Sequence, residues 1–87
     1  TEFSLFQNYP NPFNPSTTIA FSLPRSSEVR LVLVNSLGQV VKDIASGNYE
    51  AGEHRMTVDA SDLATGVYFY RLQAGEFVDM RKLVLIK

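Results

Sequence analysis

The sequence predicts an all-β domain of antiparallel strands, and two observations support this fold class. Short apolar or alternating runs are cut by Gly, Pro, Asn and Ser at intervals of roughly 8–12 residues, a spacing typical of sandwiches and barrels. The 87 residues fit a single domain, and the absence of cysteine leaves a hydrophobic core as its source of stability. We expect one domain over residues 1–87, with a Pro- and Asn-rich strap over residues 1–16 and a compact sandwich over residues 17–87.

The predicted strands follow the apolar runs in order along the chain. Counting an extended N-terminal piece, about seven are expected, over residues 3–6, 19–23, 28–35, 40–45, 53–58, 67–73 and 77–86. Pro24 closes the second strand because proline lacks a backbone N–H. Residues 35–38 predict a hairpin turn with Gly38 at positive φ, and residues 74–76 predict the last hairpin.

The strand over residues 28–35 is apolar on both faces. Leu31 and Leu33 share one face, and Val32 and Val34 share the other. We therefore expect this strand to be covered on both sides or to pack against the N-terminal segment.

One segment departs from the β pattern. Residues 59–66 offer an N-cap candidate in Asp59 or Ser61, and Gly66 stands where a single helical turn would end. Tyr68 follows in the spacing of the corner of immunoglobulin-like sandwiches, where a tyrosine hydroxyl bonds to upstream backbone. We interpret Tyr68 as this corner tyrosine, with a ligand-stacking ring as the alternative, and we expect Gly66 to hold a positive φ.

The strap is rich in proline. Residues 8–15 contain most of the prolines in the chain, and proline can neither donate a hydrogen bond to a ladder nor sit in a central strand. We expect this segment to lie along the sandwich, with Tyr9 and Phe13 inserted at the margin of the core.

The charge balance argues against a nucleic-acid binder. The chain has 8 Lys+Arg against 9 Asp+Glu, a formal charge of −1, so it lacks the basic patch that such partners require. The longest apolar run, residues 83–86, is too short to span a bilayer. No cationic segment followed by an apolar one opens the chain, so no secretory signal is expected in this piece.

No catalytic, cofactor or metal site is predicted. His54 is the single histidine and has no ligand or acid–base partner at a recognised spacing, so we expect a partly buried or edge-strand residue. No serine stands in a Gly-x-Ser-x-Gly elbow. Asp59 and Asp62 could supply oxygens to Ca²⁺, but the dense alternate carboxylates of such a site are lacking, which favours a role in capping and Asx turns.

A carbohydrate-binding module or a structural spacer of a secreted hydrolase is the alternative class of function. Residues 47–52 are expected to form a loop, and Tyr49 within it is the best candidate for an exposed sugar-binding ring. Core packing accounts for most of the other aromatic residues.

The last strand has a basic end. Arg81, Lys82 and Lys87 bracket the apolar residues 83–86. This pattern fits a final strand whose charged edge discourages aggregation. It also fits an exposed terminal strand suited to capture by β-augmentation, and the sequence leaves both interpretations open.

Taken together, these motifs resemble the type A C-terminal sorting domain of the type IX secretion system, which occurs in Bacteroidetes and related bacteria. The matching blocks are residues 7–19 (QNYPNPFNPSTTI), 37–39 (LGQ), 51–54 (AGEH), 59–63 (DASDL), 66–72 (GVYFYRL) and 82–87 (KLVLIK).

The resemblance implies a seven-stranded immunoglobulin-like sandwich that acts as an export address without catalytic activity. It implies a secreted multidomain protein that crosses the periplasm, is recognised by an outer-membrane translocon and is released or attached at the cell surface after cleavage by a sortase-like peptidase. No nucleic acid, small-molecule substrate or cofactor is expected, and the cargo lies N-terminal to this chain. In the last strand, Lys82, Leu83, Leu85 and Lys87 match the signature of the family. We expect recognition by the whole of that segment, Lys82, Leu83, Val84, Leu85, Ile86 and Lys87. The structural motif residues that match are Asn11, Pro12, Phe13, Gly66 and Tyr68. Because the sequence stops at Lys87, we expect the signal to be read at a C-terminus.

Overall fold

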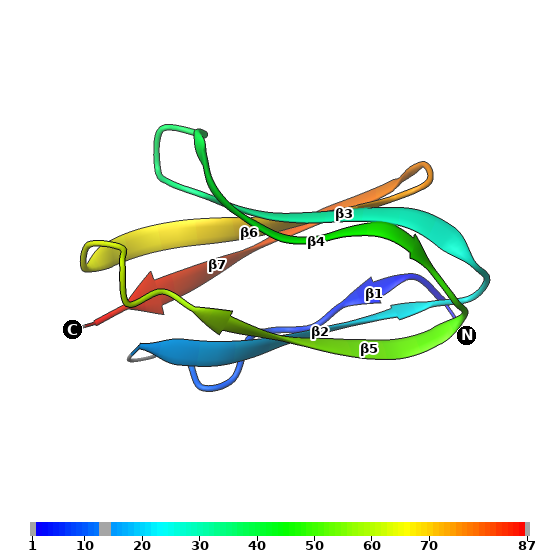
Figure 1. Ribbon diagram of the computed structural model, residues 1–87, viewed down its shortest axis with the longest axis horizontal. Helices are drawn as coiled ribbons and strands as arrows, with labels where there is room; N and C mark the ends of the chain where they lie inside the picture. Colours follow the sequence, from blue (N-terminus) through cyan, green and yellow to red (C-terminus); the bar gives the residue numbers. More distant parts are fainter. Residues whose placement is uncertain (1, 13–14, 87) are drawn as a thin grey trace.

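The computed structural model describes residues 2–12 and 15–86 as two antiparallel sheets packed face to face (Figure 1). The strands are β1 (Ser4–Leu5), β2 (Ser16–Leu23), β3 (Ser27–Val34), β4 (Val40–Tyr49), β5 (Gly52–Asp59), β6 (Gly66–Ala74) and β7 (Phe77–Leu85). The predicted all-β immunoglobulin-like sandwich is therefore confirmed. Two residues of the predicted motifs, Phe13 and Lys87, lie outside the described residues. Within the described ranges, no helix is long and apolar enough to cross a membrane.

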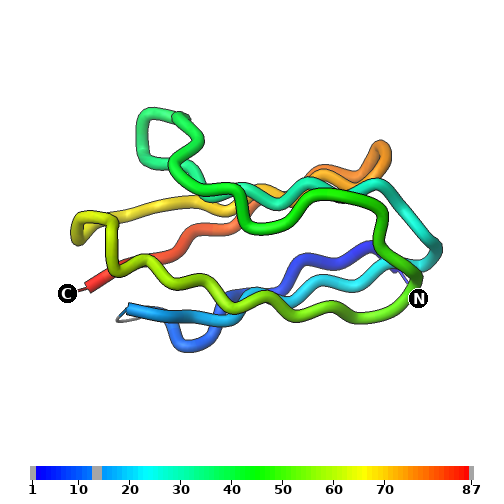
Figure 2. Tube along the Cα trace, in the orientation of Figure 1, coloured from blue at the N-terminus to red at the C-terminus, as the bar shows by residue number. Residues whose placement is uncertain are grey.

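The strands form a large and a small sheet. The large sheet has the order β4-β3-β6-β7, and the small sheet has the order β1-β2-β5. The molecule measures 37 × 23 × 17 Å, and β1 begins at the opposite end of its long axis from the point where β7 ends (Figure 2). At the edges of the sandwich, β1 meets β7 on one side and β4 meets β5 on the other.

Alternating side chains build the core. In β2, Ile19, Phe21 and Leu23 are fully buried, and the residues between them are partly exposed. The period of two places every second side chain on the inner face, so each sheet offers one apolar face to the other. The large sheet contributes the buried side chains Val29, Leu31, Leu33, Ala45, Tyr68, Tyr70, Leu72, Ala74, Leu83 and Leu85.

The strand β3 is buried on both faces, as its sequence predicts. Val32 and Val34 are 1% and 5% exposed, yet they lie outside the core cluster, on the outer face of the large sheet. Neighbouring strands flank them: Val32 is paired with Asp43 and Arg71. Of the two alternatives that the sequence leaves open, cover on both sides of the strand is therefore confirmed.

The glycines of two hairpin turns have the positive φ that those turns require. Gly38 has a φ of 83° and donates its N–H to Asn35, closing the β3–β4 turn. The β6–β7 loop has Gly75 at a φ of 60°, the positive φ that a type II′ turn needs at its first central residue.

Two local predictions are wrong. The expected loop over residues 47–52 is mostly strand, because the end of β4 continues to pair with β3 as far as Tyr49. Residues 60–65 contain a hydrogen-bonded turn, in which the Leu63 N–H donates to the Ala60 carbonyl, in place of the expected helical turn.

Candidate functional site: the terminal strand and its strap

The alternation of β7 divides the predicted sorting residues into two groups. Leu83 and Leu85 point into the sandwich, and both are 0% exposed. Lys82 and Ile86 are exposed on the outer side, and Val84 is half-buried between them. A partner can touch only the second group while the domain stays folded.

Side chains of the strap occupy the outer edge of β7. Gln7 Nε2 donates to the Lys82 carbonyl at 2.9 Å, and the Val84 N–H donates to Asn11 Oδ1 at 3.0 Å. β7 pairs with β6 on one side only, so these two backbone groups would otherwise be open to another strand. Asn11, from the predicted motif, is therefore an edge cap, and Pro12 follows it on the surface. Capture of β7 by β-augmentation at this point requires that the two side chains move away.

The buried centre of the strap is Asn8, which is 2% exposed. Its Nδ2 donates to Thr17 Oγ1 at 3.0 Å and to the Pro10 carbonyl at 3.1 Å, and the Thr17 hydroxyl donates to the same carbonyl at 2.8 Å. The expected insertion of Tyr9 is wrong, because its side chain is 81% exposed. We did not predict the role of Asn8. Its signal in the sequence is an amide side chain beside prolines, which cannot donate hydrogen bonds of their own.

Two side chains of the last hairpin hold the main chain of the strap. Tyr70 is fully buried, and its hydroxyl donates to the Phe6 carbonyl at 2.6 Å. Arg81 Nε donates to the Leu5 carbonyl at 2.6 Å. Burial raises the pKa of the Tyr70 hydroxyl above its usual 10.0, which keeps it protonated as a donor. The strap therefore ties the small sheet to β6 and β7 along one side of the sandwich.

The predicted corner tyrosine is confirmed. Tyr68 is 8% exposed, and its hydroxyl donates to the Ala64 carbonyl at 2.6 Å. The accompanying prediction for Gly66 is wrong, because Gly66 does not have a positive φ. A Cβ placed on Gly66 would lie 4.0 Å from the Tyr68 ring, an ordinary contact distance.

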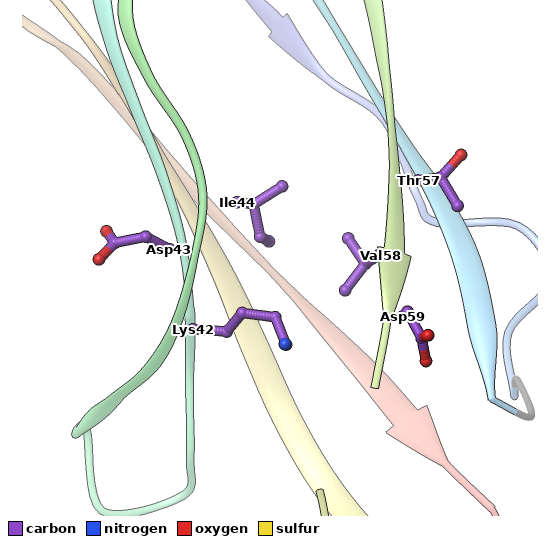
Figure 3. A pocket seen from close by; sticks show the side chains of 6 residues that line it. All are labelled: Lys42, Asp43, Ile44, Thr57, Val58 and Asp59. Atoms are coloured by element: carbon purple, nitrogen blue, oxygen red, sulfur yellow. The ribbon is translucent and has the colours of Figure 1, made fainter. Parts of the chain in front are cut away.

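A small cavity of about 210 Å³ opens between β4 and β5, on the side away from the strap. It is lined by Lys42, Asp43, Ile44, Thr57, Val58 and Asp59 (Figure 3). Asp59 Oδ1 accepts the Ser61 N–H at 2.9 Å, and this bond lowers the pKa of the Asp59 carboxyl, with Lys42 acting in the same direction. Lys42 Nζ lies 3.5 Å from Asp62. The Asx turn expected of Asp59 is confirmed, although no helix follows for it to cap. The described residues contain no cluster of three or more His, Cys, Asp or Glu that could hold a metal ion.

The residues considered for catalysis or sugar binding pack against each other. The His54 ring lies 5.4 Å from the Phe21 ring and 5.2 Å from the Tyr49 ring, and its Nε2 is 2.7 Å from the Glu50 carbonyl. Tyr49 ends β4 and is half-buried against the core, so it does not stand in a loop as expected. Its ring packs against the Phe21 ring at a centroid distance of 5.9 Å and an interplanar angle of 76°, so it does not stand free as a sugar-binding platform.

Comparison with known protein families identifies the family of the chain. The family model described as "Secretion system C-terminal sorting domain" matches residues 7–87. A search of curated proteins found no match. The matched range contains the strap residues Asn8 and Asn11, the corner and the whole of β7.

Proposed function

The chain belongs to the secretion system C-terminal sorting domain family of the type IX pathway, and we propose that it is the export signal of a larger secreted protein. Proteins with this tail reach the cell surface or the extracellular space. We propose that the cargo lies N-terminal to the domain and passes through the periplasm. The folded domain is then recognised by the outer-membrane translocon and removed by a sortase-like peptidase.

The observation that carries this proposal is the family match over residues 7–87, which includes every strand except β1. The fold supports it because the described residues form a sandwich with its own core and with tied edges. Such a unit can fold independently of the cargo and present the same surface whatever protein precedes it.

We propose that recognition uses the last hairpin, β6 and β7. Lys82, Val84 and Ile86 form its accessible part, and Leu83 and Leu85 hold it on the core. The start of β1 and the end of β7 lie at opposite ends of the sandwich (Figure 1). A cargo joined before β1 therefore leaves the end of β7 free for a partner.

We also propose that the domain has no catalytic role. Its histidine is occupied by ring contacts and by the Glu50 carbonyl, and the polar side chains of the strap are paired with backbone groups. These groups have structural partners, which supports a binding module over an enzyme.

The test is export of a fluorescent reporter that carries a signal peptide and this domain at its C-terminus, in a bacterium with a type IX system. We expect reporter at the cell surface or in the medium, and in the periplasm of a translocon mutant. A fusion lacking residues 83–87 should also stay in the periplasm.

An unrelated immunoglobulin-like sandwich in place of the domain separates a signal from a spacer. Export of that fusion at the normal level would show that the domain is only a spacer. Export of the wild-type fusion from the translocon mutant would rule out the proposed pathway.

A further inference from the structure

The outer face of the large sheet, the side turned away from the small sheet, has an apolar surface that extends across its four strands. Cross-strand pairing defines its rows: Val34 lies opposite Phe69 and Phe69 opposite Lys82 in one row. In the next row Val32 lies opposite Arg71 and Arg71 opposite Met80. The exposed and half-buried apolar side chains on this face are Val40, Val67, Phe69, Val78, Met80 and Val84.

This surface is more apolar than is usual for a sheet face that meets only water. Val78 and Met80 are 56% and 48% exposed, and both lie on the edge strand β7. The outer positions of β5 are instead Glu53, Arg55 and Thr57, as expected for a face that meets only water. A connected apolar area of this kind marks an interaction site in a soluble domain.

Two cations interrupt the apolar surface. Arg71 and Lys82 are diagonal neighbours on β6 and β7, since Lys82 pairs with Phe69 and Arg71 pairs with Met80. Neither has an ion-pair partner among the described residues. Arg30, farther along β3, is already paired with Asp43. On this face, the positive charge without an ion-pair partner therefore lies over the last hairpin.

We propose that this face docks a protein partner whose contact surface is apolar and carries carboxylates opposite Arg71 and Lys82. The inference rests on the proposed function. It assigns recognition by the export machinery to the outer face of the large sheet and to a partner surface that is both apolar and acidic. Apolar contact supplies the buried area, and the two cations select an acidic partner and fix its orientation. A second copy of the domain is a poor occupant, because a two-fold contact would bring Arg71 and Lys82 close to the same cations of the other copy.

The experiment uses the exported reporter fusion. The double variant Arg71→Glu/Lys82→Glu reverses the charge of the face, and Arg71→Lys/Lys82→Arg conserves it. The matched control is Arg25→Glu/Arg55→Glu, which makes the same change in net charge on the β2–β3 turn and the small sheet. We expect charge reversal on the face to lower surface delivery by roughly tenfold or more, because like charges now meet. The conservative and control variants should be delivered as the wild type.

Folding is checked by thermal unfolding of each purified domain. If the charge-reversed domain does not fold, the exposed pair Val78→Ser/Met80→Ser replaces it, and the same loss of delivery is expected. Normal delivery of a folded face variant, or an equal loss in the control, overturns the proposal.

Two measurements in solution test the alternative partners of this face, which are a lipid surface and a second copy of the domain. Binding to vesicles of phosphatidylglycerol and phosphatidylcholine that depends on Arg71 and Lys82 would identify a lipid surface and overturn the proposal. So would a dimer in sedimentation that Met80→Ser dissolves. Absence of both, with the loss of delivery above, supports a protein partner. Failure of the wild-type fusion to reach the surface would instead refute the proposed function itself.

Discussion

The backbone N–H of Val84 donates to Oδ1 of Asn11 at 3.0 Å, so two residues 73 positions apart meet at the edge of the terminal strand. The contact gives a physical role to an asparagine of the family motif. A strand edge with free N–H and C=O groups pairs readily with other chains, and proteins cover such edges in several ways. Here the amide side chain of Asn11 covers the edge. The prolines on either side of Asn11 lack backbone N–H groups, so this segment cannot cover the edge by pairing with β7 as a regular strand.

Asn11→Ala should weaken this edge without damaging the core. We expect the free energy of unfolding to fall by about 0.5–1 kcal/mol, the usual worth of one hydrogen bond near the surface. Hydrogen exchange at the Val84 amide should also become faster. Urea unfolding and exchange followed by NMR measure both effects. Asn48→Ala, on the exposed part of β4, is the matched control. Unchanged exchange at Val84 would contradict the edge-cap role of Asn11.

Tyr68→Phe tests the corner. The substitution removes the partly buried hydrogen bond to the Ala64 carbonyl, so we expect a loss of about 0.5–1.5 kcal/mol in the free energy of unfolding. Tyr9→Phe should have almost no effect, because that side chain is 81% exposed. Chemical denaturation of the two variants side by side gives the comparison. Equal stabilities would show that the corner hydrogen bond does not contribute.

Gly66→Ala and Gly75→Ala should have different effects on the free energy of unfolding. Gly66 lies in β6 without a positive φ, and an added Cβ meets only the Tyr68 ring at 4.0 Å. We expect no loss there, since glycine in a strand is itself unfavourable by roughly 0.5–1 kcal/mol relative to alanine. Gly75 has a φ of 60°, so alanine should cost about 1–2 kcal/mol. Thermal unfolding of both variants measures these effects. A large loss of stability in Gly66→Ala would show that the backbone at Gly66 is constrained in another way.

The stability of the domain should fall in alkaline solution through Tyr70. Burial raises the pKa of its hydroxyl above the usual 10.0, so the unfolded chain loses this proton at a lower pH than the folded chain. The stabilisation is therefore complete below pH 10.0 and is lost as the pH rises through the folded-state pKa. Denaturant midpoints from neutral to alkaline pH, with Tyr70→Phe as the comparison, measure the effect. If the variant loses stability as steeply as the wild type, Tyr70 is not the group responsible.

The sequence predicts most of this fold because its signals are local. Alternation in β2 and the glycine of the β6–β7 turn need no knowledge of the rest of the chain. The end of β4 could not be predicted in this way, since Gly47 and Tyr49 form strand only through their pairing with Val29 and Ser27. Pairing with a neighbouring strand of the same sheet overrides the local tendency of glycine to form a loop.

The candidate site is less predictable from the sequence, because most of its contacts join residues that are far apart along the chain. The corner has a fixed spacing within one segment, so Tyr68 was found. The contacts of Asn11 and Gln7 with β7 join the two ends of the chain, and no local pattern encodes them. The sequence therefore predicts the strap as a segment, but it does not predict that Asn8 is buried, and the predicted insertion of Tyr9 is wrong.

The terminal motif should separate into folding and recognition residues when its positions are changed one at a time. Leu83→Ala removes a side chain that is 0% exposed, and we expect a loss of about 2–5 kcal/mol in the free energy of unfolding. Ile86→Ala changes a side chain that is 47% exposed, and its cost should stay within about 0.5 kcal/mol. Denaturation of the isolated domain gives both values. A defect in export of the Leu83 variant should then follow the unfolded fraction and diminish at a lower growth temperature, because folding restores the surface that the partner reads. A defect that persists in a fully folded Leu83 variant would mean that the buried face of β7 is itself exposed during export.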